Sequence, residues 1–73
     1  MKLIVDKYDE EIGEHIVQRV EEGFKEAQVY DTYIKLVWLD FLGCEKRTEI
    51  VKYANADLLS IMDNGKFLHL MTR

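Results

Sequence analysis

The side chains in this sequence that could do chemistry are few: two histidines and one cysteine beside many acids. His15 follows Glu11 by four residues, a spacing that would place both side chains on one face of a helix as potential metal ligands. A zinc site needs about three or four protein ligands, so this pair is incomplete. We therefore expect no metal site and interpret His15 as part of a solvated surface.

Cys44 is the second candidate, because Lys46 and Arg47 follow it closely and nearby cations favour the reactive thiolate. The adjacent Glu45 acts in the opposite direction, and no histidine lies near Cys44 in the sequence. The sequence contains no glycine-rich phosphate loop, nucleophile elbow or paired-carboxylate motif. These observations predict a protein that is not an enzyme and that binds no cofactor.

Length and composition predict one small domain, residues 1–73, with 48% hydrophobic residues and no proline. A domain of this size buries only about 60% of the surface that its unfolded chain exposes. Part of its apolar surface must then be covered by another chain. We expect a homo-oligomer, or a complex with a protein partner whose identity the sequence leaves open.

The net charge of −4 is concentrated between Asp6 and Glu26, where eight acids and three bases occur. No basic patch is present, which argues against direct binding of nucleic acid. No apolar run reaches the roughly 18 residues of a membrane span, and Asp6 interrupts Met1–Val5 too early for a signal peptide. With a single cysteine, these features predict a cytoplasmic protein that binds no membrane.

The N-terminal third favours a short strand at Lys2–Val5 followed by an amphipathic helix over about residues 9–27. Asp9 is a typical helix N-cap residue, and the acids after it suit the first helical turn. Apolar residues recur at helical spacing and charged residues lie between them. The expected apolar stripe is Ile12, Ile16, Val20, Phe24 and Ala27.

The rest of the chain is rich in β-branched and aromatic residues, which favours strands. We expect an α+β fold whose helix precedes an antiparallel four-stranded meander at about 30–40, 46–54, 58–62 and 67–72. Such a meander can also curl into a small barrel. Residues 30–62 fit helical spacing as well, so a mostly α alternative with three helices and a short two-stranded sheet stays open.

Asn64-Gly65 predicts a two-residue hairpin turn that pairs residues 58–62 with residues 67–71. Facing residues share a side of the sheet, so Leu59, Ile61, Leu68 and Leu70 form a purely apolar core side. The other side also contains large apolar groups, which suits a contact surface. The predicted interface residues are Leu58, Met62, Phe67, His69 and Met71.

Two functions follow from these features. The first is a small non-catalytic interaction or regulatory module that self-associates through apolar strand faces. The alternative is an acidic inhibitor that imitates nucleic acid in the basic groove of a nucleic-acid-acting enzyme, of the kind that phages and mobile elements encode. Its carboxylates would form an acidic helix face of Glu10, Glu11, Glu14, Glu21, Glu22 and Glu26.

Overall fold

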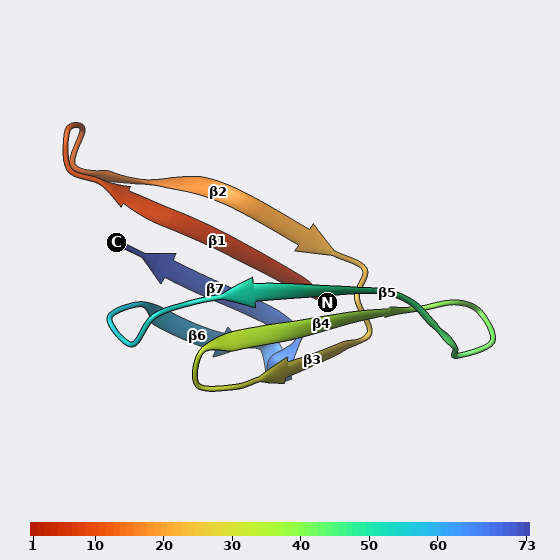
Figure 1. Cartoon of the computed structure of the whole chain (residues 1–73). Helices are drawn as coiled ribbons and strands as arrows, with labels where there is room; N and C mark the ends of the chain where they lie inside the picture. The colour runs from red at the N-terminus through yellow and green to blue at the C-terminus, as the bar shows by residue number, and fades with distance from the viewer.

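The computed structural model describes all residues of the chain, 1–73, and they form two β-sheets (Figure 1). Sheet A has four strands in the order β2-β1-β7-β6, and sheet B has three in the order β3-β4-β5. The turns β1–β2 and β4–β5 project from opposite ends, so the molecule is 47 Å long and 21 Å wide. The elements are β1 (Lys2–Asp9), β2 (Glu14–Glu22), β3 (Glu26–Val29), β4 (Tyr33–Leu39), β5 (Glu45–Lys52), β6 (Leu58–Met62), the single 3-10 turn η1 (Asp63–Gly65) and β7 (Phe67–Thr72).

The helix predicted over residues 9–27 is wrong, because this segment contains a turn, strand β2 and the start of β3. Gly13 and Gly23 have positive φ angles of 69° and 82°, which a helix does not contain, and they lie on either side of β2. Asp9 caps a tight turn instead of a helix: its side chain accepts the Glu11 N–H at 2.9 Å. The short N-terminal strand is also longer than predicted, since β1 continues to Asp9.

The four-stranded meander is wrong as well, although strands occupy its four segments. Strand β5 pairs with β4 in sheet B, and β6 pairs with β7 in sheet A, so the predicted order breaks between β5 and β6. The remaining edge of β7 pairs in parallel with β1 from the other end of the chain. Neither sheet closes into a barrel, and the α+β class and its mostly α alternative are both incorrect.

None of the chain's helical segments has the length and hydropathy needed to cross a membrane.

The C-terminal hairpin has the predicted register, with Ser60 opposite His69 and Leu59 opposite Leu70. Its turn differs in detail, because Asp63, Asn64 and Gly65 all have positive φ angles. The last ladder pair is therefore Met62 with Phe67, and the turn is closed by the Lys66 N–H donating to the Asp63 carbonyl at 3.0 Å.

The two sheets pack face to face around one hydrophobic core. Phe24, in the linker from sheet A to sheet B, is fully buried and meets the Trp38 ring edge to face at a centroid distance of 5.6 Å. Of the predicted core side, Leu68 and Leu70 are buried and Leu59 packs against them, but Ile61 is 57% exposed. The core residues are Leu3, Val5, Phe24, Ile34, Leu36, Val51, Leu68 and Leu70.

Candidate interaction surface on sheet A

One face of sheet A, here called the outer face, is turned away from sheet B. Leu3 pairs with Leu68 and Val5 with Leu70, and all four side chains are buried on the inner face. Because side chains alternate along a strand, the residues between them point outward. The apolar residues of the outer face are Ile4, Val17, Val20, Leu58, Met62, Phe67 and Met71.

All five residues predicted to form an interface lie on this outer face, on β6 and β7. Leu58 is 58% exposed and Met62 is 44% exposed. Phe67, His69 and Met71 are half-buried by their neighbours on the sheet. The structure therefore brings these residues together on one accessible surface, and their role in binding stays a prediction.

Asp6 is the only buried charged residue of the chain, and it lies in the middle of the outer face. Its carboxylate contacts two histidines: His69 Nε2 is bonded to Oδ2, and His15 Nδ1 lies 2.9 Å from Oδ1. The His15 contact is close but poorly aligned, which leaves Oδ1 without a well-directed donor. Thr72 Oγ1 donates to the Asp6 carbonyl at 3.0 Å. The contacts of Asp6 with His15, His69 and Thr72 thus connect strands β1, β2 and β7.

A β-bulge positions this cluster. The β1–β2 register pairs Val5 with Arg19 and then Asp6 with Val17, so Gln18 has no partner on β1. After the bulge, His15 lies opposite Tyr8, and their rings are 5.2 Å apart. Asp6 was not among the predicted site residues. Its one signal in the sequence is a single acid that follows a run of β-branched and aliphatic residues.

An aspartate between two histidines can in principle relay protons or bind a metal. Ser60 lies opposite His69 on β6 and forms no hydrogen bond with it. No group of three His, Cys, Asp or Glu side chains in the chain could hold a metal ion. Glu11, the predicted companion of His15, lies in the β1–β2 turn and not on a shared helix face. The arrangement is a buried aspartate side chain held between two partly exposed imidazoles on the outer face.

Cys44 lies in the turn between β4 and β5 and has an exposed thiol. Asp40 organises this turn, because its side chain accepts the N–H groups of Leu42 at 2.8 Å and of Cys44 at 3.0 Å. Arg47, one of the two cations near Cys44 in the sequence, is bound to carboxylates further along β5 and on β2. The cysteine is therefore a turn residue.

The acidic residues expected on one helix face are spread over different parts of the fold. Glu10 and Glu11 lie in the β1–β2 turn, and Glu26 lies on β3. On β2, Glu21 points toward sheet B while Glu22 points outward, as their partners Leu3 and Lys2 do. Without the helix these carboxylates share no common face, so the geometry does not favour the nucleic-acid mimic.

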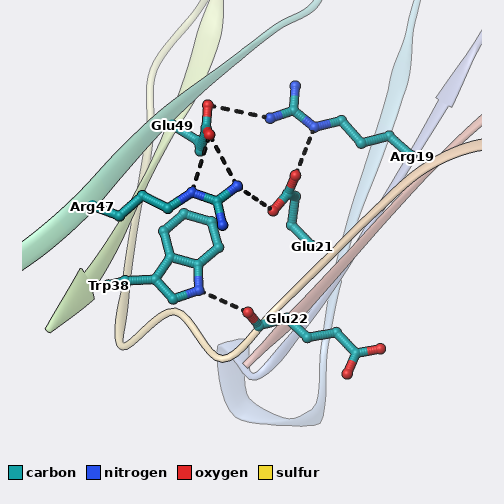
Figure 2. Close-up of polar contacts among 6 residues, drawn as sticks. All are labelled: Arg19, Glu21, Glu22, Trp38, Arg47 and Glu49. Atoms are coloured by element: carbon teal, nitrogen blue, oxygen red, sulfur yellow. Dashed lines mark hydrogen bonds and ion pairs between the residues drawn. The ribbon is translucent and has the colours of Figure 1, made fainter. Parts of the chain in front are cut away.

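The sheets are joined at one side by a cluster of Arg19 and Glu21 from β2 with Arg47 and Glu49 from β5 (Figure 2). Arg19 lies 3.6 Å from Glu49 and Arg47 lies 3.4 Å from Glu21, so both ion pairs cross between the sheets. The Arg47 guanidinium also stacks over the Trp38 ring at 4.4 Å. The signal for this cluster is an opposite-charge pair at i and i+2 in each strand.

Trp38 connects this cluster to the linker between the sheets (Figure 2). Its indole N–H donates to the Glu22 carbonyl at 2.7 Å, just before Gly23 turns the chain toward sheet B. A Cβ atom at Gly23 would lie 3.6 Å from the indole nitrogen, an ordinary van der Waals distance, so it is the positive φ and not a lack of space that favours glycine here. The tryptophan thus fixes the angle at which the chain leaves β2.

Replacing Arg47 with lysine is expected to destabilise the fold by about 1 kcal/mol, because lysine keeps the charge but loses the planar stacking and paired contacts. Urea unfolding, followed by fluorescence of the single tryptophan Trp38, measures the change. The matched control is Lys46→Arg at an adjacent cation that forms no ion pair. Equal unfolding midpoints for the two variants would contradict the stacking role.

Comparison of the chain with protein-family models, with curated proteins and with solved structures gave no match.

Proposed function

We propose that this chain is a small non-catalytic interaction module that self-associates through the apolar surface of sheet A. The observation that carries the proposal is the grouping of Leu58, Met62, Phe67 and Met71 on β6 and β7, with no charged residue in either strand. A second copy suits this surface, since uncharged apolar patches do not repel their own kind. The overall charge of −4 supports a protein partner and not nucleic acid or a membrane.

The accessible surface of the chain supports the same proposal. The isolated chain exposes 5230 Å², and only 10 of its 73 residues are buried. A compact monomer of this mass is expected to expose about 4,700 Å². The excess of roughly 500 Å² is a substantial part of the ~800 Å² that each partner buries in a standard interface.

The proposal is tested by the oligomeric state at about 100 µM, measured by sedimentation velocity. We expect the wild-type chain to dimerise and Met62→Lys to raise the dissociation constant at least ~10-fold, because it buries an unpaired charge at the contact. The control is Ile50→Lys, since Ile50 on sheet B is also 44% exposed. A monomeric wild-type chain, or equal weakening by both variants, would refute this proposal.

We further propose a cytoplasmic location. The supporting observation is Cys44, an unpaired and exposed thiol, which is maintained most easily in a reducing compartment.

A further inference from the structure

Four strands form the edges of the two sheets, and three of them are protected against pairing with another strand. Strands β2 and β5 carry several charged side chains, and bulges interrupt their ladders at Val5/Asp6 and Trp38/Leu39. Strand β3 is only four residues long and begins with Glu26. Strand β6, LLSIM, has no charge, no proline and a regular ladder with β7. Charges, bulges and short length are the usual protections of an edge strand. Strand β6 has neither a charged residue nor a bulge.

The backbone hydrogen bonds show which groups of β6 are free. The Lys2 N–H donates to the Lys66 carbonyl at 2.9 Å, so alternate residues from Lys66 onward direct their backbone groups toward β1. Phe67, His69 and Met71 then direct theirs toward β6. Their partners Met62, Ser60 and Leu58 are bonded to β7, which leaves Leu59 and Ile61 with N–H and C=O groups on the open edge.

We propose that β6 pairs antiparallel with β6 of a second copy about a two-fold axis at Ser60. This inference rests on the proposed self-association and places the contact at the β6 end of the apolar surface, where Leu58 and Met62 lie. Leu59 of each copy exchanges two backbone hydrogen bonds with Ile61 of the other, which satisfies the free groups of both residues. Sheet A becomes one continuous eight-stranded sheet, because each copy contributes the four strands of its sheet A.

Side-chain chemistry agrees with this register. Leu59 lies beside Ile61 of the other copy on the inner face, and Leu58 lies beside Met62 on the outer face. Leu58 and Ile61 are 58% and 57% exposed in the single chain, and both side chains become more buried when the second copy lies beside them. Asp57 and Asp63, which flank β6, come near each other across the axis. Their repulsion predicts that added salt strengthens the dimer.

Neighbouring symmetric registers are poorer. Centring the axis on Leu59 would place Ile61 opposite Asp57, whose N–H already donates to the Ala54 carbonyl at 3.0 Å. Centring it on Ile61 would place Leu59 opposite Asp63, where φ is 52° and the backbone is not extended. Only the axis at Ser60 pairs all four free groups with available partners.

Disulfide trapping tests the register in a Cys44→Ser background, which removes the native exposed thiol. Ser60 faces itself as a non-hydrogen-bonded pair, with Cα atoms about 4.5 Å apart, inside the range that a disulfide spans. We expect Ser60→Cys to become a covalent dimer under mild oxidation. The control on the same strand is Met62→Cys, which faces Leu58 and should crosslink at least ~10-fold more slowly.

A second variant tests the hydrogen bonds. Because the Ile61 N–H points to the open edge, Ile61→Pro removes a bond between copies while keeping the ladder with β7. We expect a folded chain by circular dichroism whose dimer dissociation constant is at least ~10-fold higher.

The outcomes separate the two proposals. Trapping at Ser60 together with weakening by Ile61→Pro supports the pairing of β6. A dimer that is neither trapped at Ser60 nor weakened by Ile61→Pro overturns this inference and leaves self-association standing. A monomeric wild-type chain overturns both.

Discussion

Replacing Phe24 with alanine is expected to unfold most of the protein at 25 °C. The side chain has no exposed surface and packs among residues of both sheets and against Trp38. Truncating a buried phenylalanine costs about 3–5 kcal/mol, which comprises the lost transfer energy and the cavity left behind. A single core of this size supplies about 3–5 kcal/mol of total stability. The mutation therefore removes most or all of it.

Urea unfolding followed by Trp38 fluorescence and far-ultraviolet circular dichroism measures this effect at one fixed protein concentration, because self-association adds stability. Phe41→Ala provides the matched control: the chemical change is the same, but Phe41 is 95% exposed in the β4–β5 turn. Its stability should stay within about 0.5 kcal/mol of the wild-type value. A Phe24→Ala protein as stable as Phe41→Ala would show that the linker does not hold the sheets together.

The second large effect is expected at Asp6. Asp6→Ala removes the carboxylate of a residue that is 6% exposed, which leaves His69 Nε2 without its bonded partner and His15 Nδ1 without its nearby carboxylate oxygen. A hydrogen bond to a charged group contributes about 1.5–3 kcal/mol to stability. Because both histidines are partly open to solvent, water replaces some of the lost contacts and we expect about 2–3 kcal/mol.

A double-mutant cycle separates this contact from general damage to β1. Asp6→Ala, His69→Ala and the double variant should show a coupling energy of about 1–3 kcal/mol in urea unfolding. The control is Asp31→Ala, at an exposed turn residue that makes no side-chain hydrogen bond or ion pair. Additive free energies for Asp6 and His69 would show that their contact does not stabilise the native state.

The helix predicted over residues 9–27 is wrong because the spacing of its apolar residues is ambiguous. Ile12, Ile16, Val20 and Phe24 recur every four residues, which approximates the helical period of 3.6 and is also a multiple of the strand period of 2. The glycines at 13 and 23 were the better signal. Their positive φ angles occur at turns on either side of a strand, a conformation that a helix interior does not contain.

The candidate surface was only partly accessible to sequence reasoning. The five interface residues could be placed on one side of a hairpin because Asn64-Gly65 and the alternation around it are local. Asp6 could not be placed beside them, since it lies 63 residues before His69 in the chain. The crossed ion pairs of Arg19, Glu21, Arg47 and Glu49 required knowing that β2 and β5 approach one another.

The sequence by itself determined local features of this protein: the C-terminal hairpin with its register, and the small uncharged apolar surface of β6 and β7. Neighbouring residues suffice for these, because turn geometry and side-chain alternation act over a few positions. It left strand and helix both open for residues 30–62, which the structure shows as strands at 33–39, 45–52 and 58–62. Only the tertiary structure decided that residues 14–22 are a strand, that β1 lies in parallel beside β7, and that β5 and β6 belong to different sheets. Those choices depend on which distant segments bury apolar groups together, and the free energy of that burial outweighs local helix preference.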